Sequence, residues 1–233
     1  AMETLLFKNK SITMEQLLKA LDDDFEGHER LRQQILNQAP KFGNDEPTAD
    51  RLAGQILRMY CDEVNKYSNP RGGKYVPGFW TMTTHNGFGS YTGALPNGRK
   101  AGASFAEGIT PSAGSDRNGP TASMKSVVSL GMENIGNGCT LNQKFSPSAL
   151  AGEKGSRDLA SLMQTYFDLG GMQVQFNVVD RETLVEAKNH PERHPGLLVR
   201  VSGYSAYFAD LTPEMQDEVI ARTEQSFGGS CCR

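Results

Sequence analysis

Thiols are the most reactive side chains in this sequence, and their spacing limits what they can do. Cys139 lies in the glycine-rich run Gly136–Thr140, a loop context that favours an accessible thiol. Cys61 begins a Cys-x-Glu triplet but falls inside a predicted helix, where a free cysteine often packs as a small apolar residue. The four cysteines show no CxxC pair and no Cys/His ligand spacing, so we expect neither a zinc nor an iron–sulfur site.

Five other residues carry weaker signals. His85 lies in a stretch rich in glycine, threonine and aromatic residues, where it could act as a general acid or base or be a structural histidine. Glu107 and Asp116 flank predicted turns and are expected to cap them or to face solvent. Cys231 and Cys232 belong to a terminal Gly-Gly-Ser-Cys-Cys-Arg tail, and the sequence assigns them no role.

The most distinctive segment is Arg200–Phe208, with the sequence Arg-Val-Ser-Gly-Tyr-Ser-Ala-Tyr-Phe. Its single glycine, Gly203, stands among bulky residues, after the apolar run Leu197–Val199 and before a helix start at Thr212. Because glycine has no Cβ, its backbone can form a tight turn and lie close to a reacting centre. An ordinary turn glycine between a strand and a helix is the alternative.

The segment Arg200–Phe208 resembles the glycyl radical motif of the glycyl radical enzymes, with Gly203 at the radical position. The residues after Gly203 are typical of the dehydratase, decarboxylase and C–C-adding branch and differ from those of pyruvate formate-lyase. Further stretches are similar to the C-terminal part of the same family and extend the likeness over residues 5–227. They are Asn69–Gly73, Thr92–Gly102, Asn142–Pro147 and Gln175–Val179.

The resemblance implies a radical mechanism. In this family a separate activating enzyme, which uses S-adenosylmethionine and an iron–sulfur cluster, removes one hydrogen from the glycine Cα. The glycyl radical then takes the hydrogen of a cysteine thiol on a facing loop, and the thiyl radical takes hydrogen from a small-molecule substrate. We therefore expect an organic radical on Gly203 and no bound cofactor.

The resemblance also makes Arg200, Ser202 and Tyr204 the motif neighbours of the radical. Arg200 is expected either to hold the loop by pairing with a carboxylate or to point outward from a strand. Tyr204 and Tyr207 are expected to pack near Gly203 and to keep water and oxygen away from it.

The catalytic cysteine of the family lies on a Gly/Ser-rich loop that nothing in this sequence matches. Cys139 is a better physical candidate for the thiol than Cys61. We expect an oxygen-sensitive lyase of anaerobic metabolism that takes its thiol from a missing part or a larger partner subunit and is inactive alone. A stand-alone radical carrier that restores a damaged partner enzyme is the alternative.

The implied fold is α/β and comprises part of a ten-stranded β/α barrel, built from two half-barrels, together with a glycyl radical domain. We place the barrel part in residues 1–110 and the radical domain in residues 111–233. The stretch 74–118 shows neither helical nor alternating periodicity.

Apolar periodicity and capping signals predict the regular elements. Helices are predicted over 14–22, 29–37, 48–67, 120–130, 156–169, 180–189 and 213–223, and strands over 173–179 and 197–201. A capping box is predicted at Thr13 and Gln16, and helix caps at Thr48, Ser156, Asp180 and Thr212. Ile56 and Met59 are expected on the apolar side of the third helix, and Val174, Phe176 and Val178 on the apolar side of the first strand.

Charge and hydropathy exclude several partners. The net charge is −3 and no basic stripe is present, which argues against a nucleic-acid partner. No apolar run approaches the roughly 18 residues of a membrane span. The apolar run Leu5–Phe7 is too short for a signal peptide. We therefore expect a cytoplasmic protein with a small-molecule substrate and an activating-enzyme partner.

Overall fold

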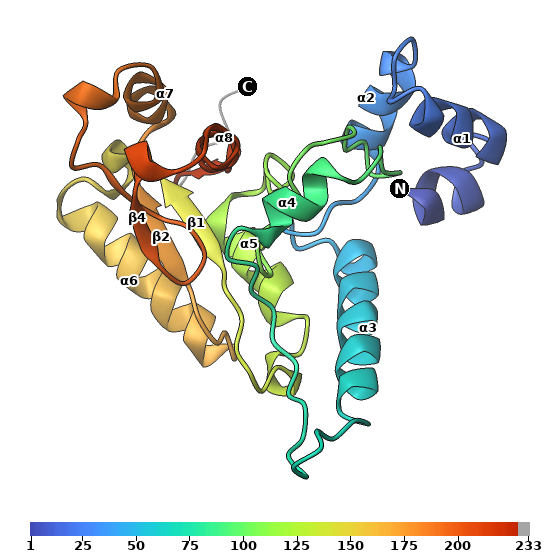
Figure 1. Cartoon of the computed structure of the whole chain (residues 1–233), viewed down its shortest axis with the longest axis horizontal. Coiled ribbons are helices and arrows are strands. Elements are labelled where there is room, and N and C mark those ends of the chain that lie inside the picture. Colours follow the sequence, from blue (N-terminus) through green and yellow to red (C-terminus); the bar gives the residue numbers. More distant parts are fainter. Residues whose placement is uncertain (228–233) are drawn as a thin grey trace. The chain divides into compact units, whose positions relative to one another are not determined.

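The computed structural model describes residues 1–227, which fall into two compact units (Figure 1). The smaller unit joins Ala1–Pro40 to Thr84–Phe105, and the larger unit joins Lys41–Thr83 to the chain from Ala106 onward. The family-based boundary between residues 110 and 111 stays a prediction. Over residues 1–227, no helix has the length and apolar character that a membrane crossing needs, and no group of three or more His, Cys, Asp or Glu could hold a metal ion.

Helices fill the smaller unit. They are a π-helix (Met2–Lys8), α1 (Met14–Asp22), α2 (Glu29–Gln38) and α4 (Thr84–Ser90). The predicted capping box of α1 is present, because Thr13 accepts the N–H of Gln16 and the Gln16 side chain accepts the N–H of Thr13. The fully buried apolar residues of this unit are Leu5, Ile12, Leu17, Ala20, Phe25, Ile35 and Ala39.

A three-stranded parallel sheet organises the larger unit, with the strand order β2–β1–β5. The central strand β1 (Asn142–Phe145) pairs with β2 (Gln175–Val178) and with β5 (Glu224–Gln225). Helix α6 (Gly152–Asp168) connects β1 to β2, as parallel strands require. The predicted α/β class is confirmed.

The other main elements of the larger unit are four helices and a hairpin. They are α3 (Pro47–Val64), α5 (Gly119–Val128), α7 (Arg181–Asn189), α8 (Pro213–Ala221), and the antiparallel strands β3 (Leu198–Arg200) and β4 (Ser205–Tyr207). Short 3-10 helices cover Met132–Asn134, Pro147–Leu150, Pro191–Arg193 and Phe208–Asp210. The caps predicted for α7 and α8 are confirmed, since Asp180 and Thr212 accept the N–H groups of Thr183 and Met215.

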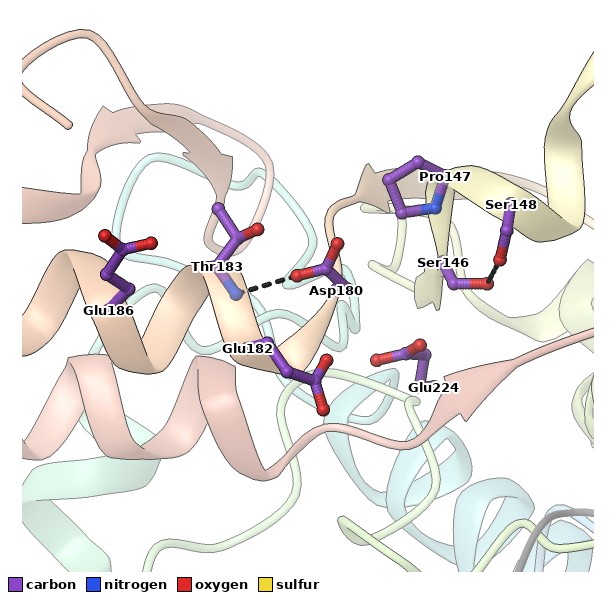
Figure 2. A pocket seen from close by; sticks show the side chains of 8 residues that line it. All are labelled: Ser146, Pro147, Ser148, Asp180, Glu182, Thr183, Glu186 and Glu224. Atoms are coloured by element: carbon purple, nitrogen blue, oxygen red, sulfur yellow. Dashed lines mark hydrogen bonds between the residues drawn. The ribbon is translucent and has the colours of Figure 1, made fainter. Parts of the chain in front are cut away.

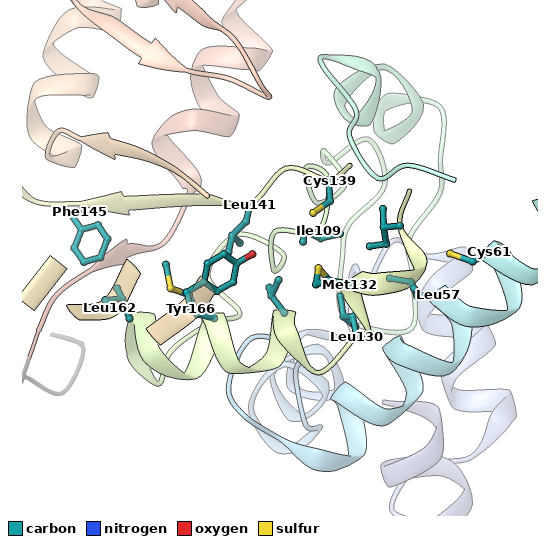
Figure 3. Close-up of a cluster of buried hydrophobic side chains, with 13 residues drawn as sticks. Leu57, Cys61, Ile109, Leu130, Met132, Cys139, Leu141, Phe145, Leu162 and Tyr166 are labelled. Atoms are coloured by element: carbon teal, nitrogen blue, oxygen red, sulfur yellow. The ribbon is translucent and has the colours of Figure 1, made fainter. Parts of the chain in front are cut away.

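Two apolar clusters stabilise the larger unit. The first surrounds Tyr166 and includes Leu57 of α3, Phe145 of β1 and Leu162 of α6 (Figure 3). The second packs the β3–β4 hairpin against α7 and α8. Its buried members are Val179, Leu184, Ala187, Val199, Val201, Phe208, Met215, Val219 and Ile220.

Two cations hold the C-terminal end of α8. Lys144 Nζ and Arg181 Nη1 each donate to the carbonyl of Ile220 at 3.1 Å, where the partial negative charge of the helix end favours cations. Lys144 is 2% exposed, and burial lowers its pKa to about 8. These contacts join the end of α8 to β1 and to α7.

Three helix predictions need correction. α3 begins at Pro47 after Glu46, so Thr48 lies inside its first turn and is not the cap. α6 begins at Gly152, and the hydroxyl of Ser156, the predicted cap, donates instead to the carbonyl of Gly152. The stretch 74–118, predicted without regular structure, contains the short helix α4.

The side predicted to be apolar on α3 is not its buried side. Ile56 and Met59 are 66% and 71% exposed, whereas Leu57 and Cys61 are buried. The buried side also carries Asp50, whose carboxylate accepts the hydroxyl of Ser126 at 2.9 Å. The contacts made by α3, and not its apolar residues alone, decide which side turns inward.

Strand β2 reverses the predicted alternation. Gln175 and Asn177 are 5% and 4% exposed, while Val178 is 50% exposed. The period of two is as expected for a strand. The polar side is nevertheless buried, because its amides bond the β3–β4 hairpin.

Asp116 makes the stability of the chain depend on pH. It is 5% exposed, and its carboxylate accepts hydrogen bonds from Thr223 and Gln225. Burial raises its pKa from 3.8 to about 6. The native chain therefore binds this proton more tightly than the unfolded chain, and its contribution to the free energy of unfolding falls as the pH rises from about 4 to about 6.

The free energy of unfolding should decrease between about pH 4 and about pH 7, and we expect Asp116→Asn to make this decrease smaller by roughly 3 kcal/mol, as measured by urea unfolding. The asparagine oxygen can still accept from Thr223, and its amide can donate to a rotated Gln225 side chain. An unchanged pH dependence in the variant would contradict the assignment to Asp116.

Candidate functional site

Gly203 lies at the tip of the β3–β4 hairpin. The Val201 N–H donates to the Tyr204 carbonyl at 2.9 Å, which closes a tight turn around Ser202 and Gly203. Gly203 has a φ of +79°, a left-handed conformation that glycine adopts without steric cost. It is exposed, so the turn presents its Cα at the surface of the described chain.

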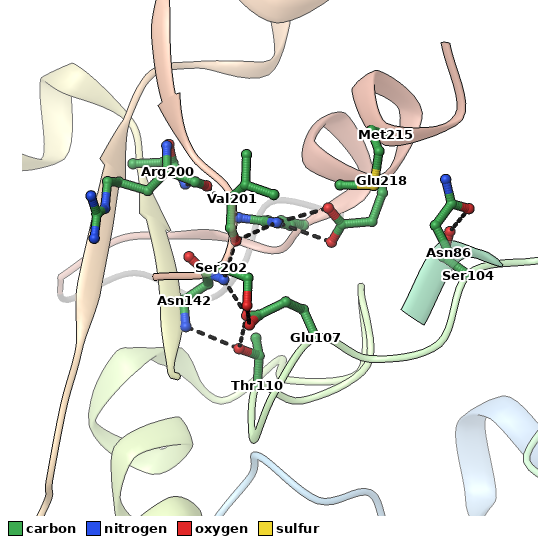
Figure 4. A network of polar contacts seen from close by, with 12 residues as sticks. Asn86, Ser104, Glu107, Thr110, Asn142, Arg200, Val201, Ser202, Met215 and Glu218 are labelled. Atoms are coloured by element: carbon green, nitrogen blue, oxygen red, sulfur yellow. Dashed lines mark hydrogen bonds and ion pairs between the residues drawn. The ribbon is translucent and has the colours of Figure 1, made fainter. Parts of the chain in front are cut away.

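A buried carboxylate, Glu107, anchors this turn (Figure 4). Its side chain is 2% exposed and accepts hydrogen bonds from the hydroxyls of Thr110, Thr140 and Ser202 and from the amide of Asn142. A buried carboxylate is costly unless it is hydrogen-bonded, and four donors meet that requirement here. The residue next to Gly203 is thereby tied to the loop at 107–110 and to the start of β1.

Gly108 allows Glu107 to reach this position. Its φ is +53°, and a Cβ there would overlap the hydroxyl of Thr140. The loop is further held by Ile109, whose N–H donates to the Thr140 carbonyl at 3.0 Å. A larger residue at 108 would push the Glu107 carboxylate away from its donors.

Two side-chain amides connect Glu107 to Gly203 itself. The Gly203 N–H donates to Gln175 Oε1 at 3.1 Å, and Gln175 Nε2 donates to Asn142 Oδ1 at 2.6 Å. Asn142 Nδ2 donates to the Glu107 carboxylate and to the Val201 carbonyl, the latter at 2.8 Å. Asn142 and Gln175 are opposite each other in the β1–β2 register, so the parallel sheet sets their spacing.

A buried ion pair holds the strand that leads into the turn. Arg222, just after α8, lies 2.8 Å from Glu218, and their side chains are 6% and 8% exposed. Arg222 also donates to the carbonyls of Arg200 and Val201 at 2.9 and 3.1 Å. Breaking such a pair would leave a buried charge without compensation, so the end of β3 is firmly placed.

The motif neighbours have distinct positions. The guanidinium of Arg200 donates to Gln175 Oε1 and to the hydroxyl of Ser205, both at 3.1 Å, and so holds the hairpin through neutral acceptors. Tyr204 packs against the second apolar cluster, and Tyr207 is 49% exposed. Gly203 is exposed in the part of the chain that the structure describes, so the two tyrosines do not cover it as predicted.

Cys139 does not present the accessible thiol that its glycine-rich context suggested. It is 5% exposed in the first apolar cluster. Burial, together with the charge of Glu107, raises its pKa to about 11. Cys139 is buried because Phe79 forms a backbone bridge with the loop, through hydrogen bonds to Gly138 and Thr140.

Two of the remaining candidates, Cys61 and His85, are buried. Cys61 is 2% exposed inside α3, as expected for a cysteine that packs in a helix. His85 is 2% exposed in α4 of the smaller unit. Cys231 and Cys232 lie outside the described residues.

A surface hollow of about 630 Å³ contains several carboxylates but does not include Gly203 (Figure 2). Its lining residues are Ser146, Pro147, Ser148, Asp180, Glu182, Thr183, Glu186 and Glu224. Asp180 caps α7 by accepting the Thr183 N–H at 2.7 Å, and Glu224 accepts the N–H of Arg181 at 3.1 Å. These two carboxylates therefore have structural partners.

Sequence reasoning missed the burial of two carboxylates, one of which, Glu107, is the acceptor at the centre of the site. Glu107 and Asp116 were expected to cap turns or face solvent, but they are 2% and 5% exposed. The closest available signal for the site was β2, where Gln175 and Asn177 place two amides on one side of a short strand. Two amide side chains that are two residues apart on a strand can hydrogen-bond a neighbouring backbone as readily as they can face water.

Two family models match the chain. The family described as glycine radical matches residues 105–209, which include Gly203 and Glu107. The family described as pyruvate formate lyase-like matches residues 1–89.

Curated relatives and solved structures agree with these matches. The chain is 44% identical to the probable dehydratase YbiW of Escherichia coli and 43% identical to the trans-4-hydroxy-L-proline dehydratase of Clostridioides difficile. These alignments cover 96% and 95% of this chain but only 29% and 28% of the relatives. The B12-independent glycerol dehydratase of Clostridium butyricum, solved with glycerol, is 46% identical, with a TM-score of 0.92 over 97% of this chain and 29% of that one.

The chain therefore spans less than a third of the length of these relatives. Its α/β fold matches the corresponding part of glycyl radical enzymes with the pyruvate formate-lyase-like barrel fold. The hairpin with its exposed glycine, the two family models and these relatives lead to one conclusion: the chain belongs to the glycyl radical enzyme family.

Proposed function

We propose that Gly203 carries the radical of an enzyme that acts on a small molecule by elimination, decarboxylation or C–C addition. The observation that supports this most is the turn at Gly203. Its Cα is exposed and its φ is left-handed, and its N–H is held by Gln175 within the segment that matches the glycine radical family.

The turn suits a radical on the peptide Cα. Such a radical is flat and is delocalised over the amide nitrogen on one side and the carbonyl on the other, so the absence of a Cβ relieves crowding. An activating enzyme with S-adenosylmethionine and an iron–sulfur cluster would remove one hydrogen atom from Gly203. The spin would then remain on backbone atoms of this chain.

The transfer step needs a thiol near Gly203. The S–H hydrogen of a cysteine would pass to the Gly203 Cα, which restores glycine and leaves a thiyl radical that takes hydrogen from the substrate. Cys139 and Cys61 are buried in the first apolar cluster, and neither sulfur lies within 4 Å of the position that a Cβ on Gly203 would take. Cys231 and Cys232 lie outside the described residues, and no stretch of the sequence resembles the loop that carries the thiol in this family. We infer that the thiol comes from protein outside this chain, and that the chain is inactive without it.

The relatives favour elimination of water as the reaction. Their names describe dehydratases acting on hydroxyproline and glycerol, so a small hydroxylated substrate is the class we propose first. A radical carrier that restores a damaged partner enzyme is the second candidate. It is favoured by the exposure of Gly203 at the tip of the turn, where a partner protein could reach it.

These two functions differ in what a partner must bring. A larger subunit with its own thiol and substrate pocket would turn over substrate only together with this chain. A carrier would instead restore activity to a full-length relative whose own glycine had been destroyed. Mixing activated chain with each kind of partner separates the two cases.

The radical domain at residues 111–233 and the cytoplasmic location remain part of this proposal.

Electron paramagnetic resonance tests the radical assignment. After anaerobic activation we expect a doublet, because the one hydrogen left on the Gly203 Cα splits the signal, and we expect Gly203→Ala to abolish it. Among residues 1–227, an alanine Cβ would meet only Thr140 Cγ2 at 3.7 Å, so the variant should fold at a strain cost of roughly 1–2 kcal/mol.

Gly170→Ala is the matched control, since Gly170 has a φ of +93° and open space at its Cβ but lies outside the site. It should keep the doublet. The assignment fails if an activating enzyme that works on a full-length relative gives this chain no signal, or if the doublet persists in Gly203→Ala.

Alkylation tests the claim about the thiols. In a variant with Cys231 and Cys232 changed to serine, we expect iodoacetamide to leave Cys61 and Cys139 unmodified in the native chain and to modify both in urea. With a pKa of about 11, only roughly one Cys139 in a thousand would be a thiolate at about pH 8, and burial would restrict access further. Rapid modification of native Cys139, read by mass spectrometry, would contradict this.

A further inference from the structure

Three hydrogen bonds run in one direction from Gly203 to the buried charge of Glu107. The Gly203 N–H donates to Gln175, Gln175 donates to Asn142, and Asn142 donates to the Glu107 carboxylate. Every N–H in this series donates its hydrogen bond in the direction of the negative charge. We call Gln175, Asn142 and Glu107 the amide relay.

The orientation of both amides follows from their ends. Asn142 must turn its NH₂ group toward Glu107 and the Val201 carbonyl, since both are acceptors. Its oxygen then faces Gln175, which must present its own NH₂ group there. The oxygen of Gln175 is thereby directed to the Gly203 N–H, and a flipped amide at either position would oppose acceptor to acceptor.

The relay is shielded from water along its length. Glu107, Asn142 and Gln175 are 2%, 4% and 5% exposed. In a protein interior, charges and dipoles act on one another more strongly than in water, and successive hydrogen bonds polarise each other. The Glu107 charge therefore strengthens the acceptor that meets Gly203.

We propose that the amide relay polarises the Gly203 amide and so tunes the radical that the Cα carries, an inference that rests on the function proposed for Gly203. A stronger N–H donor bond makes the amide nitrogen more electron-rich. That nitrogen then accepts more of the unpaired spin from the Cα. Gln175 and Glu107 act as positioning residues through the peptide group of Gly203 and need no contact with substrate.

Arg200 limits the effect of the relay. Its guanidinium donates to the same Gln175 oxygen as Gly203, at the same distance of 3.1 Å. The cation withdraws electron density from that oxygen, while the Glu107 charge supplies it through the two amides. The acceptor strength of the Gln175 oxygen, and with it the polarisation of the Gly203 amide, is thus set by the opposing effects of Arg200 and Glu107.

Three variants separate the relay from general support of the hairpin. Gln175→Leu removes the acceptor. Glu107→Gln removes the charge and keeps the shape, because the hydroxyls of Thr140 and Ser202 can rotate to accept from the new amide. Asn177→Leu is the control: Asn177 lies on the same strand, and its hydrogen bonds go to the backbone of Arg200 and not to Gly203 or Glu107.

The first readout needs no radical. In the resting chain labelled with ¹⁵N-glycine, the Gly203 amide is identified by its absence from the Gly203→Ala spectrum. We expect its proton resonance to move upfield in Gln175→Leu and, by a smaller amount, in Glu107→Gln, while Asn177→Leu leaves it in place. An unmoved resonance in the first two variants, or an equal movement in the control, would overturn the relay.

The second readout is the radical itself. In anaerobically activated chain we expect the doublet splitting from the remaining Cα hydrogen to widen in Gln175→Leu and Glu107→Gln, because more spin stays on the Cα. The same splitting in wild type and all three variants would overturn the tuning and leave the proposed function standing. No doublet in wild type would overturn the proposed function, and the tuning with it, whatever the amide resonance does.

Discussion

The buried carboxylate of Glu107 is the constraint on which the rest of the site depends. It collects donors from its own loop, from the start of β1 and from the turn that holds Gly203. Without it, the amide of Asn142 and the hydroxyl of Ser202 would lose a buried acceptor, which costs about 1–3 kcal/mol for each such group. One charge thus couples the exposed turn to the sheet.

Directional contacts, more than apolar packing, orient the peptide of Gly203. Apolar clusters bring α8 and the hairpin together, but a hydrogen bond fixes an angle as well as a distance. Gln175 sets the direction of the Gly203 N–H, and Arg222 with Glu218 fixes the strand before it. This explains why the polar side of β2 is buried.

Local signals in the sequence predicted local structure well. The capping box at Thr13, the caps of α7 and α8 and the turn at Gly203 all follow from residues close together in the chain. Such local signals did not predict that Glu107 and Cys139 are buried, or which sides of α3 and β2 face inward. Each depends on partners brought near by tertiary structure, such as Thr140 for Glu107 and Phe79 for Cys139.

Cleavage by oxygen tests most directly whether the spin resides on Gly203. Oxygen adds to a backbone Cα radical and the chain then breaks at that residue. In air-exposed samples of activated chain, we expect two fragments whose masses place the break at Gly203, and an intact Gly203→Ala variant. Fragments that end elsewhere, or an intact wild-type chain after its doublet has decayed in air, would contradict the assignment of the spin to Gly203.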